Sequence, residues 1–278
     1  MSKLSFGNVE RPLWRKGLSW ARRQTWDSRL GRIARLPFVI IFNHLVIMMG
    51  LDGAYVRWRH EWKARPYYAN KSAQENVGFS HLETVEHALR RVHYKLREVA
   101  ELRVPTGSRV LDVGSGTGLV ARQLIDRWQV VGVDISPSLT EAARTIVPDA
   151  EFYVGDICDT DVGGPFAMAY SIGVIQYIPP GQLRRFFTRV ASLLCDNGII
   201  FVQYPHPVNR LQLWYPNLLE TYYRPKVMER AASEFFDTVE HHHCFRFEKK
   251  VIDLDPAPYS GNLFVNGYLY IGTKRAPS

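Results

Sequence analysis

At 278 residues and 46% apolar residues, the chain is long enough for one large globular domain, or for a domain of about 170 residues with an extension. Its net charge of +8 is uneven, because residues 1–66 carry 13 Lys or Arg against 4 Asp or Glu and the remainder carries 22 against 23. This basic N-terminal part is equally open to interpretation as a solvated helix face or as a contact with an anionic partner. The three cysteines are too widely separated for a disulfide framework or a zinc site, which favours a reducing cytosol.

Residues 1–80 predict a basic, aromatic and helical extension. Residues 1–35 combine three tryptophans with many arginines, a composition found on membrane-surface helices and at protein interfaces. The apolar run 36–49 has 14 residues, fewer than the ~20 needed to cross a bilayer. A buried or interface helix, a membrane-dipping anchor and a true span all stay open for it. A secretory signal is not expected, because the run starts late and no small-residue cleavage site follows it. Residues 52–80 mix aromatics and charges in a way that indicates a lid.

From residue 81 onward, helical and strand patterns alternate. The periodicity predicts helices over 81–102, 137–146 and 181–194, and a further helical pattern directly after the glycines at 114, 116 and 118. It predicts strands over 110–113, 130–134, 151–154, 166–172 and 199–204, with a turn at 196–198, and a late pair at 235–247 and 264–273. Such alternation predicts an α/β fold, a doubly wound and mostly parallel seven-stranded sheet covered by helices on both faces.

Three acids lie at or near the ends of the first three predicted strands. Asp112 precedes the glycine loop, Asp134 ends the second strand, and Asp156 follows the third. Ligands of a doubly wound sheet bind at the carboxyl ends of its strands, where an acid on the second strand can accept hydrogen bonds from both hydroxyls of a ribose. The glycine spacing is G-x-G-x-G, which differs from the G-x-G-x-x-G of dinucleotide-binding enzymes, and no phosphate-cradling P-loop is present.

Four motifs in this order resemble those of class I S-adenosylmethionine-dependent methyltransferases. They are the stretches 110–118, 130–134, 155–157 and 171–178, followed by a turn and strand at 194–200, and the resemblance covers about residues 105–204. It implies S-adenosylmethionine as cofactor. It also implies a set of contacts to that cofactor: Asp112, Gly114, Ser115, Gly116, Asp134, Ile135, Asp156, Ile157, Ser171 and Gln176.

The resemblance also gives several of these residues separate roles. It places Gly114, Ser115 and Gly116 along the methionine part, Asp134 on the ribose hydroxyls and Ile135 on the adenine. It places Asp156 on the adenine amino group with Ile157 beside it, and Ser171, Gln176 and Tyr177 near the methyl sulfonium. Two alternatives stay open: Asp112 supports the loop amides instead of touching the cofactor, and Asp134 serves only as a helix cap.

The acceptor is less well defined than the cofactor. The chain lacks the motifs for methylating exocyclic amines of DNA bases or C5 of pyrimidines, and it lacks an obvious carboxylate trio for magnesium. We therefore expect methyl transfer to a small-molecule, lipid- or carbohydrate-linked acceptor, with oxygen favoured as the receiving atom. Methylation of nitrogen or carbon, RNA methylation, another Rossmann-type activity and a non-catalytic partner subunit are the alternatives.

Histidines are the first candidates for the base that such a reaction requires. His206 follows the fifth strand and is the candidate base, with Tyr177 as a second catalytic candidate and an ordinary loop histidine as the alternative for His206. Tyr68, His81 and Tyr204 are the candidate acceptor contacts. No metal site is expected, because the consecutive histidines 241–243 would point to alternate faces of a strand.

The predicted organisation is an extension and lid over residues 1–80 and a cofactor-binding methyltransferase domain over 81–278, with a substrate cap at about 205–233. Residues 1–50 are expected to contact an anionic membrane surface or a partner protein, and a homodimer is a further expectation. Nucleic acid is not expected as a partner. The expected location is cytoplasmic, with peripheral membrane association as an open alternative.

Overall fold

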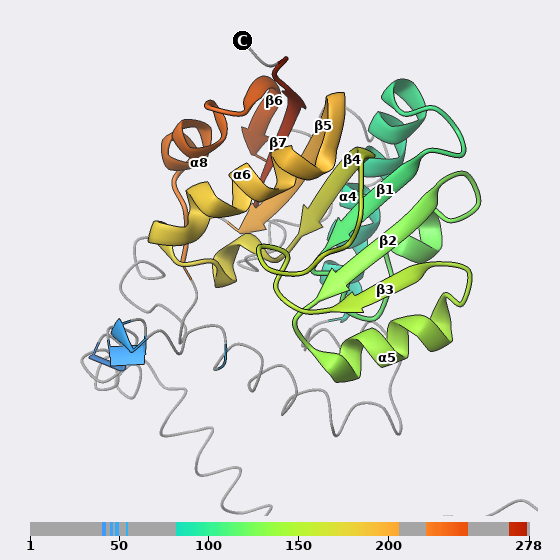
Figure 1. The fold of residues 1–278 in the computed structure, drawn as a ribbon, viewed down its shortest axis with the longest axis horizontal. Coiled ribbons are helices and arrows are strands. Elements are labelled where there is room, and N and C mark those ends of the chain that lie inside the picture. The colour runs from blue at the N-terminus through green and yellow to red at the C-terminus, as the bar shows by residue number, and fades with distance from the viewer. Residues whose placement is uncertain are drawn as a thin grey trace, which may run out of the picture.

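The computed structural model describes residues 82–205, 221–243 and 267–276, and seven residues between Ile41 and Ala54. These residues form a sheet with helices on both faces (Figure 1). The helices and strands are, in chain order, α4 (Leu82–Arg103), β1 (Arg109–Val113), β2 (Gln129–Asp134), α5 (Pro137–Ile146), β3 (Glu151–Val154), β4 (Phe166–Ile172), α6 (Leu183–Leu193), β5 (Leu194–Pro205), α8 (Pro225–Ala232), β6 (Phe236–His243) and β7 (Gly267–Lys274). Three short 3₁₀ turns complete the set: η2 (Ala121–Gln123), η3 (Ile175–Tyr177) and η4 (Pro180–Gln182).

The seven strands are arranged in the order β3-β2-β1-β4-β5-β7-β6. All neighbouring pairs are parallel except those of β7, which runs antiparallel to both β5 and β6. Strand order therefore reverses between β1 and β4, and β7 begins at the sheet edge where the other six strands end. The predicted doubly wound, mostly parallel seven-stranded sheet is confirmed.

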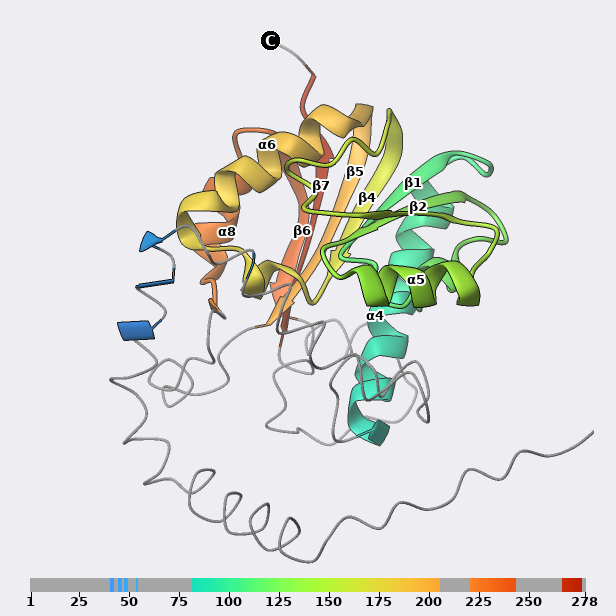
Figure 2. The ribbon, with the colours of Figure 1, turned by 60° about the horizontal axis from the view of Figure 1, so that its bottom comes forward.

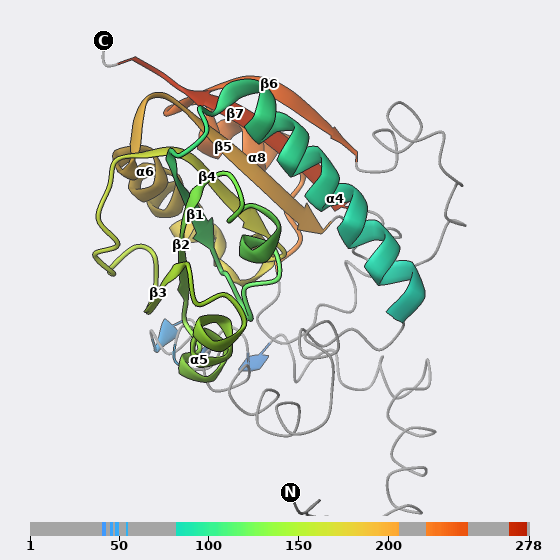
Figure 3. The same cartoon turned by 90° about the vertical axis from the view of Figure 1, so that its right-hand side faces the viewer.

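Two hydrophobic cores fill the two faces of the sheet. Successive residues of a strand point to opposite faces, so Val110 packs with α4 and α5, whereas Leu111 packs with α6 and α8. The helix α6 buries Phe186, Phe187 and Val190 at helical spacing. Figures 1 and 3 show α4 and α6 on opposite sides of the strands.

The longest described helix, α4, has 22 residues and is amphipathic. Its N-terminal turns extend beyond the sheet on the side of the strands' carboxyl ends (Figures 2 and 3). No helix within the described ranges combines the length and the apolarity needed to cross a membrane.

The α-helix predicted after the glycine loop is wrong. The structure has only the 3₁₀ turn η2 there, with backbone hydrogen bonds that alternate between third and fourth neighbours, as from Leu124 and Ile125 to Ala121. The connection must run back along β1, which spans about 17 Å. The residues after Gly118 return along β1 through a mixture of 3₁₀-type and single α-type turns, without a continuous α-helix.

Two other elements differ in extent from their prediction. Strand β5 begins at Leu194, and the predicted turn at 196–198 is an irregularity inside it, with Asn197 at a φ of 59°. Within the predicted cap, residues 225–232 form α8, which buries Met228 and Ala232 against the sheet. The segment 206–220 of that cap lies outside the described residues.

Candidate active site

The glycine loop makes a sharp turn directly after the end of β1. Gly114 has a φ of +76°, and a Cβ at this position would overlap Val174 of the loop after β4. Gly116 has a φ of +52°, and a Cβ there would meet no atom within 4 Å. Gly114 is therefore required by the protein's own packing, whereas Gly116 borders open space into which a ligand can approach the backbone.

Asp134 joins this loop to the end of β2. Its Oδ2 accepts a hydrogen bond from the backbone N–H of Gly116 at 2.9 Å, and its Oδ1 accepts one from the N–H of Ser136 at 2.9 Å. Ser136 in turn caps α5 by accepting from Leu139 N–H, with Pro137 in the first turn. Each carboxylate oxygen has two lone pairs, so Asp134 can hold the loop and still accept hydrogen bonds from a ligand hydroxyl.

Asp112 lies behind the loop, in the core. It is paired in register with Tyr170 of β4, and both residues are buried. Burial raises the pKa of Asp112 to about 8, the negative charge of Asp134 acts in the same direction, and the nearby Tyr170 hydroxyl opposes it. Although the two groups lie close enough to shift each other's pKa, Tyr170 makes no hydrogen bond of normal geometry. Asp112 is thus a buried acid directly before the glycine loop, and both its contact with the cofactor and its support of the loop amides stay predictions.

Asp156 closes the turn after β3. Its Oδ1 accepts a hydrogen bond from Cys158 N–H at 2.8 Å, and its backbone oxygen accepts from the Thr160 hydroxyl. The second carboxylate oxygen is left to accept from a ligand amino group. The neighbouring Ile157 is buried and packs in the core beneath α6.

The end of β4 and the loop after it each contribute one buried polar side chain. Ser171 has no hydrogen-bond partner for its hydroxyl, and Gln176 donates to Gly173 O at 2.6 Å while its own side-chain oxygen has none. The backbone oxygen of Gln176 accepts from Thr221 N–H at 2.7 Å. The chain segment before α8 is therefore bonded directly to this loop.

Buried side-chain polar atoms without a hydrogen-bond partner gather at one edge of the sheet. Apart from one on α4, all those in the described part of the chain follow or end β1, β4 and β5: Asp112, Ser115, Thr117, Tyr170, Ser171, Gln176 and Gln203. Buried polar groups are normally satisfied by protein, water or ligand. This edge is therefore built to receive a polar ligand.

The sequence did not single out Thr117, Tyr170 or Gln203. The only local signal for Gln203 is a polar residue within an otherwise apolar strand. Tyr170 carries no such signal, because its proximity to Asp112 arises from pairing between strands that are distant in sequence.

Tyr204, a predicted acceptor contact, is wholly buried at the end of β5. Its hydroxyl is hydrogen-bonded to His241 Nε2 at 2.8 Å, and His241 Nδ1 is hydrogen-bonded to Glu229 Oε1 of α8 at 2.8 Å. The ring of Tyr204 also stacks on Tyr268 of β7, with centroids 5.7 Å apart. These contacts turn the Tyr204 hydroxyl toward β6. The candidates His206, Tyr68 and His81 lie outside the described residues.

A helical stretch from the N-terminal extension contacts the same edge. Val46 is buried, and it packs with Phe42, Ile135 and Tyr177. Tyr177, the second catalytic candidate, thus lies beside Ile135 at the end of β2. The sequence suggested a lid in residues 52–80, but it gave no sign that residues 42 and 46 reach the site.

Comparison with known proteins agrees with this geometry. Residues 110–198 match the model of a methyltransferase domain. This part of the chain is a methyltransferase domain of the class I, S-adenosylmethionine-dependent kind. The glycine loop, Asp134 and the unpartnered polar groups at the sheet edge fit that cofactor.

Two curated relatives of the methyltransferase domain illustrate its range. The chain is 30% identical to trans-aconitate 2-methyltransferase of Enterobacter sp. (strain 638) over 114 residues. This alignment covers 40% of this chain and 44% of the relative. It is 28% identical to magnesium-protoporphyrin O-methyltransferase of Rhodobacter capsulatus over 183 residues. This alignment covers 60% of this chain and 78% of the relative. The chain thus spans less than half of the first relative's length.

Solved structures share the fold at low sequence identity. Magnesium protoporphyrin IX methyltransferase (ChlM) of Synechocystis PCC 6803, solved with bound SAH, has a TM-score of 0.56 at 14% identity and covers 81% of this chain and all of that one. The N-methyltransferase NodS of Bradyrhizobium japonicum WM9, in complex with S-adenosylhomocysteine, has a TM-score of 0.53 at 13% identity and covers 69% and 99%. These likenesses concern the fold alone.

Proposed function

We propose that this chain transfers a methyl group from S-adenosylmethionine to an oxygen of a small-molecule acceptor, of a lipid- or carbohydrate-linked kind. The observation that carries the proposal is the set of unpartnered polar side chains at the edge where Asp134 holds the glycine loop. The O-methyltransferase named among the relatives supports oxygen as the receiving atom.

The methyltransferase residues divide into three tasks. Gly114, Ser115 and Gly116 would line the methionine part of the cofactor, and Asp134 would accept hydrogen bonds from the ribose hydroxyls. Ile135, with Asp156 and its neighbour Ile157, would surround the adenine. When bound, S-adenosylmethionine supplies an electrophilic methyl group, so the protein's task is to align the acceptor with it and to remove a proton.

We assign the proton removal to His206, which follows the last residue of β5 directly. That strand ends at the same edge as β4, which carries Ser171 near its end and is followed by the loop that holds Gln176. Tyr177 would shape the acceptor side of the cofactor, since it packs against Val46, as Ile135 does. Tyr68 and His81 stay proposed acceptor contacts.

The proposed organisation follows from the same argument. Residues 1–80 would be the extension and lid, and residues 81–278 the cofactor-binding domain. Because α8 is part of the layer that covers the sheet, the substrate cap is proposed for 206–220 alone. We also propose that residues 1–50 attach the enzyme to an anionic membrane surface, a protein partner or a second copy.

The deciding experiment combines cofactor binding with labelled methyl transfer. Calorimetry should detect S-adenosylmethionine binding to the full chain, and cell extract incubated with methyl-labelled cofactor should yield a labelled small molecule. Mild alkali releases label from a methyl ester as volatile methanol, whereas ether, amine and carbon-bound methyl groups retain it. Mass spectrometry of the labelled product then separates those three. If the cofactor does not bind, the proposed function is wrong.

A further inference from the structure

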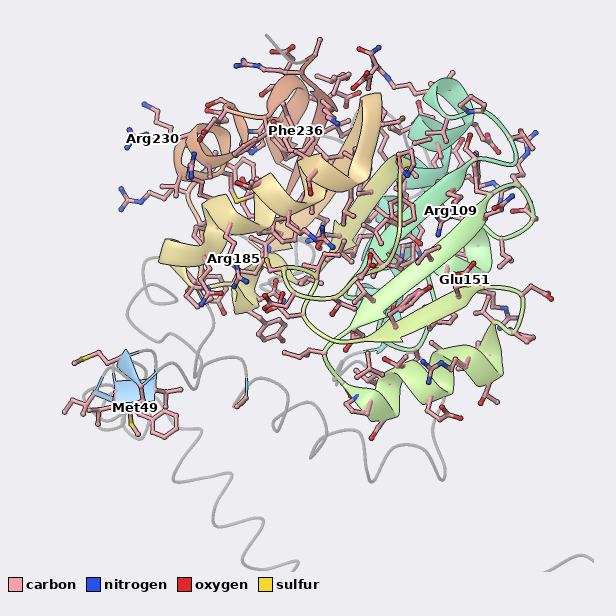
Figure 4. The ribbon with its side chains drawn as sticks, viewed as in Figure 1. Met49, Arg109, Glu151, Arg185, Arg230 and Phe236 are labelled. Atoms are coloured by element: carbon pink, nitrogen blue, oxygen red, sulfur yellow. The ribbon has the colours of Figure 1, made fainter. Side chains whose placement is uncertain are left out.

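Four large apolar side chains are exposed together on the N-terminal helical stretch. Ile41, Leu45, Met48 and Met49 are 59%, 52%, 79% and 67% exposed. The other exposed large apolar side chains of the described residues are scattered singly over α4, β3 and α8. Figure 4 shows the side chains around Met49 standing clear of the sheet. A concentrated exposed apolar patch marks an interaction site, whereas isolated ones do not.

A neighbouring face of the same stretch is attached to the cofactor side of the enzyme. Residues 42 and 46 are one helical turn apart, and the buried side chain of Val46 packs against Phe42, Ile135 and Tyr177. Residues 41, 45 and 48 follow one another at intervals of four and three, which places them on a neighbouring, exposed stripe. The stretch is therefore held by one stripe on the carboxyl edge of the sheet and presents the other stripe outward.

The sequence around the patch indicates what covers it. No charged residue occurs from Leu36 to Leu51, whereas arginines stand at 29, 32 and 35 before this run and at 57 and 59 after it. Tryptophans at 14, 20 and 26 add further interfacial residues. An apolar stripe between cationic flanks is the composition of a helix that lies in the interface of an anionic bilayer.

A second copy of the chain suits this surface poorly. A twofold interface would bring the same patch of each copy together. The N-terminal sequence that carries the patch is basic, with 13 Lys or Arg against 4 Asp or Glu over residues 1–66, so its like charge opposes pairing with a second copy. An anionic membrane offers apolar contact and opposite charge at once.

We propose that the helical stretch containing residues 41–49 docks on an anionic membrane surface through Ile41, Leu45, Met48 and Met49. Val46 keeps it attached to the cofactor side through Ile135 and Tyr177, so that docking sets the carboxyl edge of the sheet against the bilayer. This second part rests on the proposed function, because it takes Ile135 as part of the cofactor site. An acceptor that resides in the membrane, such as a lipid-linked one, would then reach the site without leaving the bilayer.

The test is co-sedimentation of the full chain with vesicles of phosphatidylcholine, alone or mixed with phosphatidylglycerol. We expect partition into the anionic vesicles to exceed that into neutral ones at least about tenfold, and to fall at high salt. The double variant Met48→Gln/Met49→Gln and the single variant Leu45→Gln should each bind anionic vesicles about tenfold more weakly. Leu102→Gln is the matched control, since Leu102 is 75% exposed on α4 and away from the patch, and it should bind as the wild type does.

Three results would overturn the docking. One is a wild-type chain that does not bind anionic vesicles. Another is a pair of patch variants that bind as tightly as Leu102→Gln. The third is a wild-type chain that light scattering shows to be a dimer and that Leu45→Gln converts to a monomer. This result would mean that the patch is an interface between two copies of the chain. Urea midpoints equal to the wild type's establish that the variants are folded.

Cofactor calorimetry without vesicles separates this proposal from the proposed function. Vesicle binding without cofactor binding would leave the docking standing and remove the methyl transfer. Val46→Ala, on the attached face, should weaken cofactor binding several-fold and leave vesicle partition within about twofold. Unchanged cofactor affinity in that variant would overturn the link between docked helix and cofactor site.

Discussion

The carboxylate of Asp134 accepts two backbone hydrogen bonds. One comes from the N–H of Gly116 in the glycine loop, and the other comes from the N–H of Ser136. The identity of Asp134 as a functional acid followed from its place at the end of a predicted strand. Its bond to Gly116 did not, since a hydrogen bond between a loop and the next strand's end depends on tertiary positions.

Asp134→Ala should weaken S-adenosylmethionine binding by about 1.5–3 kcal/mol, the range for hydrogen bonds to a charged group. The reason is the loss of ribose contacts together with the loosening of the glycine loop. Calorimetry measures it, with Asp126→Ala as control, because Asp126 pairs with Arg97 on the surface. Equal affinities in both variants would remove Asp134 from the cofactor site.

Asp112 should make the stability of the protein depend on pH. Its pKa is raised from an ordinary 3.8 to about 8 by burial, so the folded state keeps a proton that the unfolded state releases above pH 4. The stabilising contribution is complete below that pH and is lost as pH rises toward 8, with a slope of at most about 1.4 kcal/mol per pH unit.

Urea unfolding of the wild type and of Asp112→Asn between pH 5 and pH 8 tests this dependence. The amide does not titrate, so the variant should lack the decline that the wild type shows. Parallel profiles for the two proteins would mean that Asp112 is not the group responsible.

At the scale of elements, the glycines around β1 differ in whether the fold or a ligand requires them. Gly107, Gly114 and Gly116 all have a positive φ, but only the first and third have no atom within 4 Å of an added Cβ. The spacing of the glycines was legible in the sequence. Which one faces the protein and which faces open space was not.

Substitution of these three glycines by alanine should give three different results. Gly107→Ala and Gly116→Ala should each cost about 1–2 kcal/mol of stability for the left-handed backbone alone. Gly114→Ala should cost more, because its Cβ would overlap Val174. Of Gly107→Ala and Gly116→Ala, only Gly116→Ala should lose cofactor affinity. Calorimetry measures the affinity, and urea unfolding measures the stability. A loss of affinity in Gly107→Ala would show that backbone strain alone disturbs the site.

Tyr204, His241 and Glu229 join β5, β6 and α8 through two hydrogen bonds. Tyr204→Phe should lower stability by about 1–2 kcal/mol, because it leaves a buried imidazole nitrogen without its partner. Glu229→Gln should couple to it in a double-mutant cycle of urea unfolding. Additive effects would mean that the three residues do not act as one network.

Most strands and helices were predictable, because buried parallel strands and amphipathic helices leave strong periodic patterns in the sequence. The turn η2 was misread as an α-helix, since Leu119, Val120, Leu124 and Ile125 fit a helical period in any compact turn. The position of β7 between β5 and β6 could not be read at all, because strand order depends on pairing between distant segments.

For the whole molecule, the uneven charge of the chain predicts that residues 1–35 serve membrane binding and not cofactor binding. Residues 1–35 carry nine Lys or Arg and two Asp or Glu. Removing them should abolish most of the salt-sensitive binding to anionic vesicles. Cofactor affinity should stay within about twofold, since the contact to Ile135 comes from Val46. A matching loss of cofactor affinity would mean that residues 1–35 belong to the site.

The reversed direction of β7 also bears on how such proteins diverge. Because β7 begins where β5 and β6 end, Pro205 pairs with Gly267 and His243 pairs with Tyr268 at one corner of the sheet. The described chain therefore stops after Pro205 and His243 and resumes at Gly267 at this corner, which belongs to the edge where the cofactor is proposed to bind. We expect that exchanging the segments 206–220 and 244–266 for others changes the acceptor without altering a residue of the glycine loop. A chimera that grafts both segments from a relative is the corresponding experiment in the laboratory.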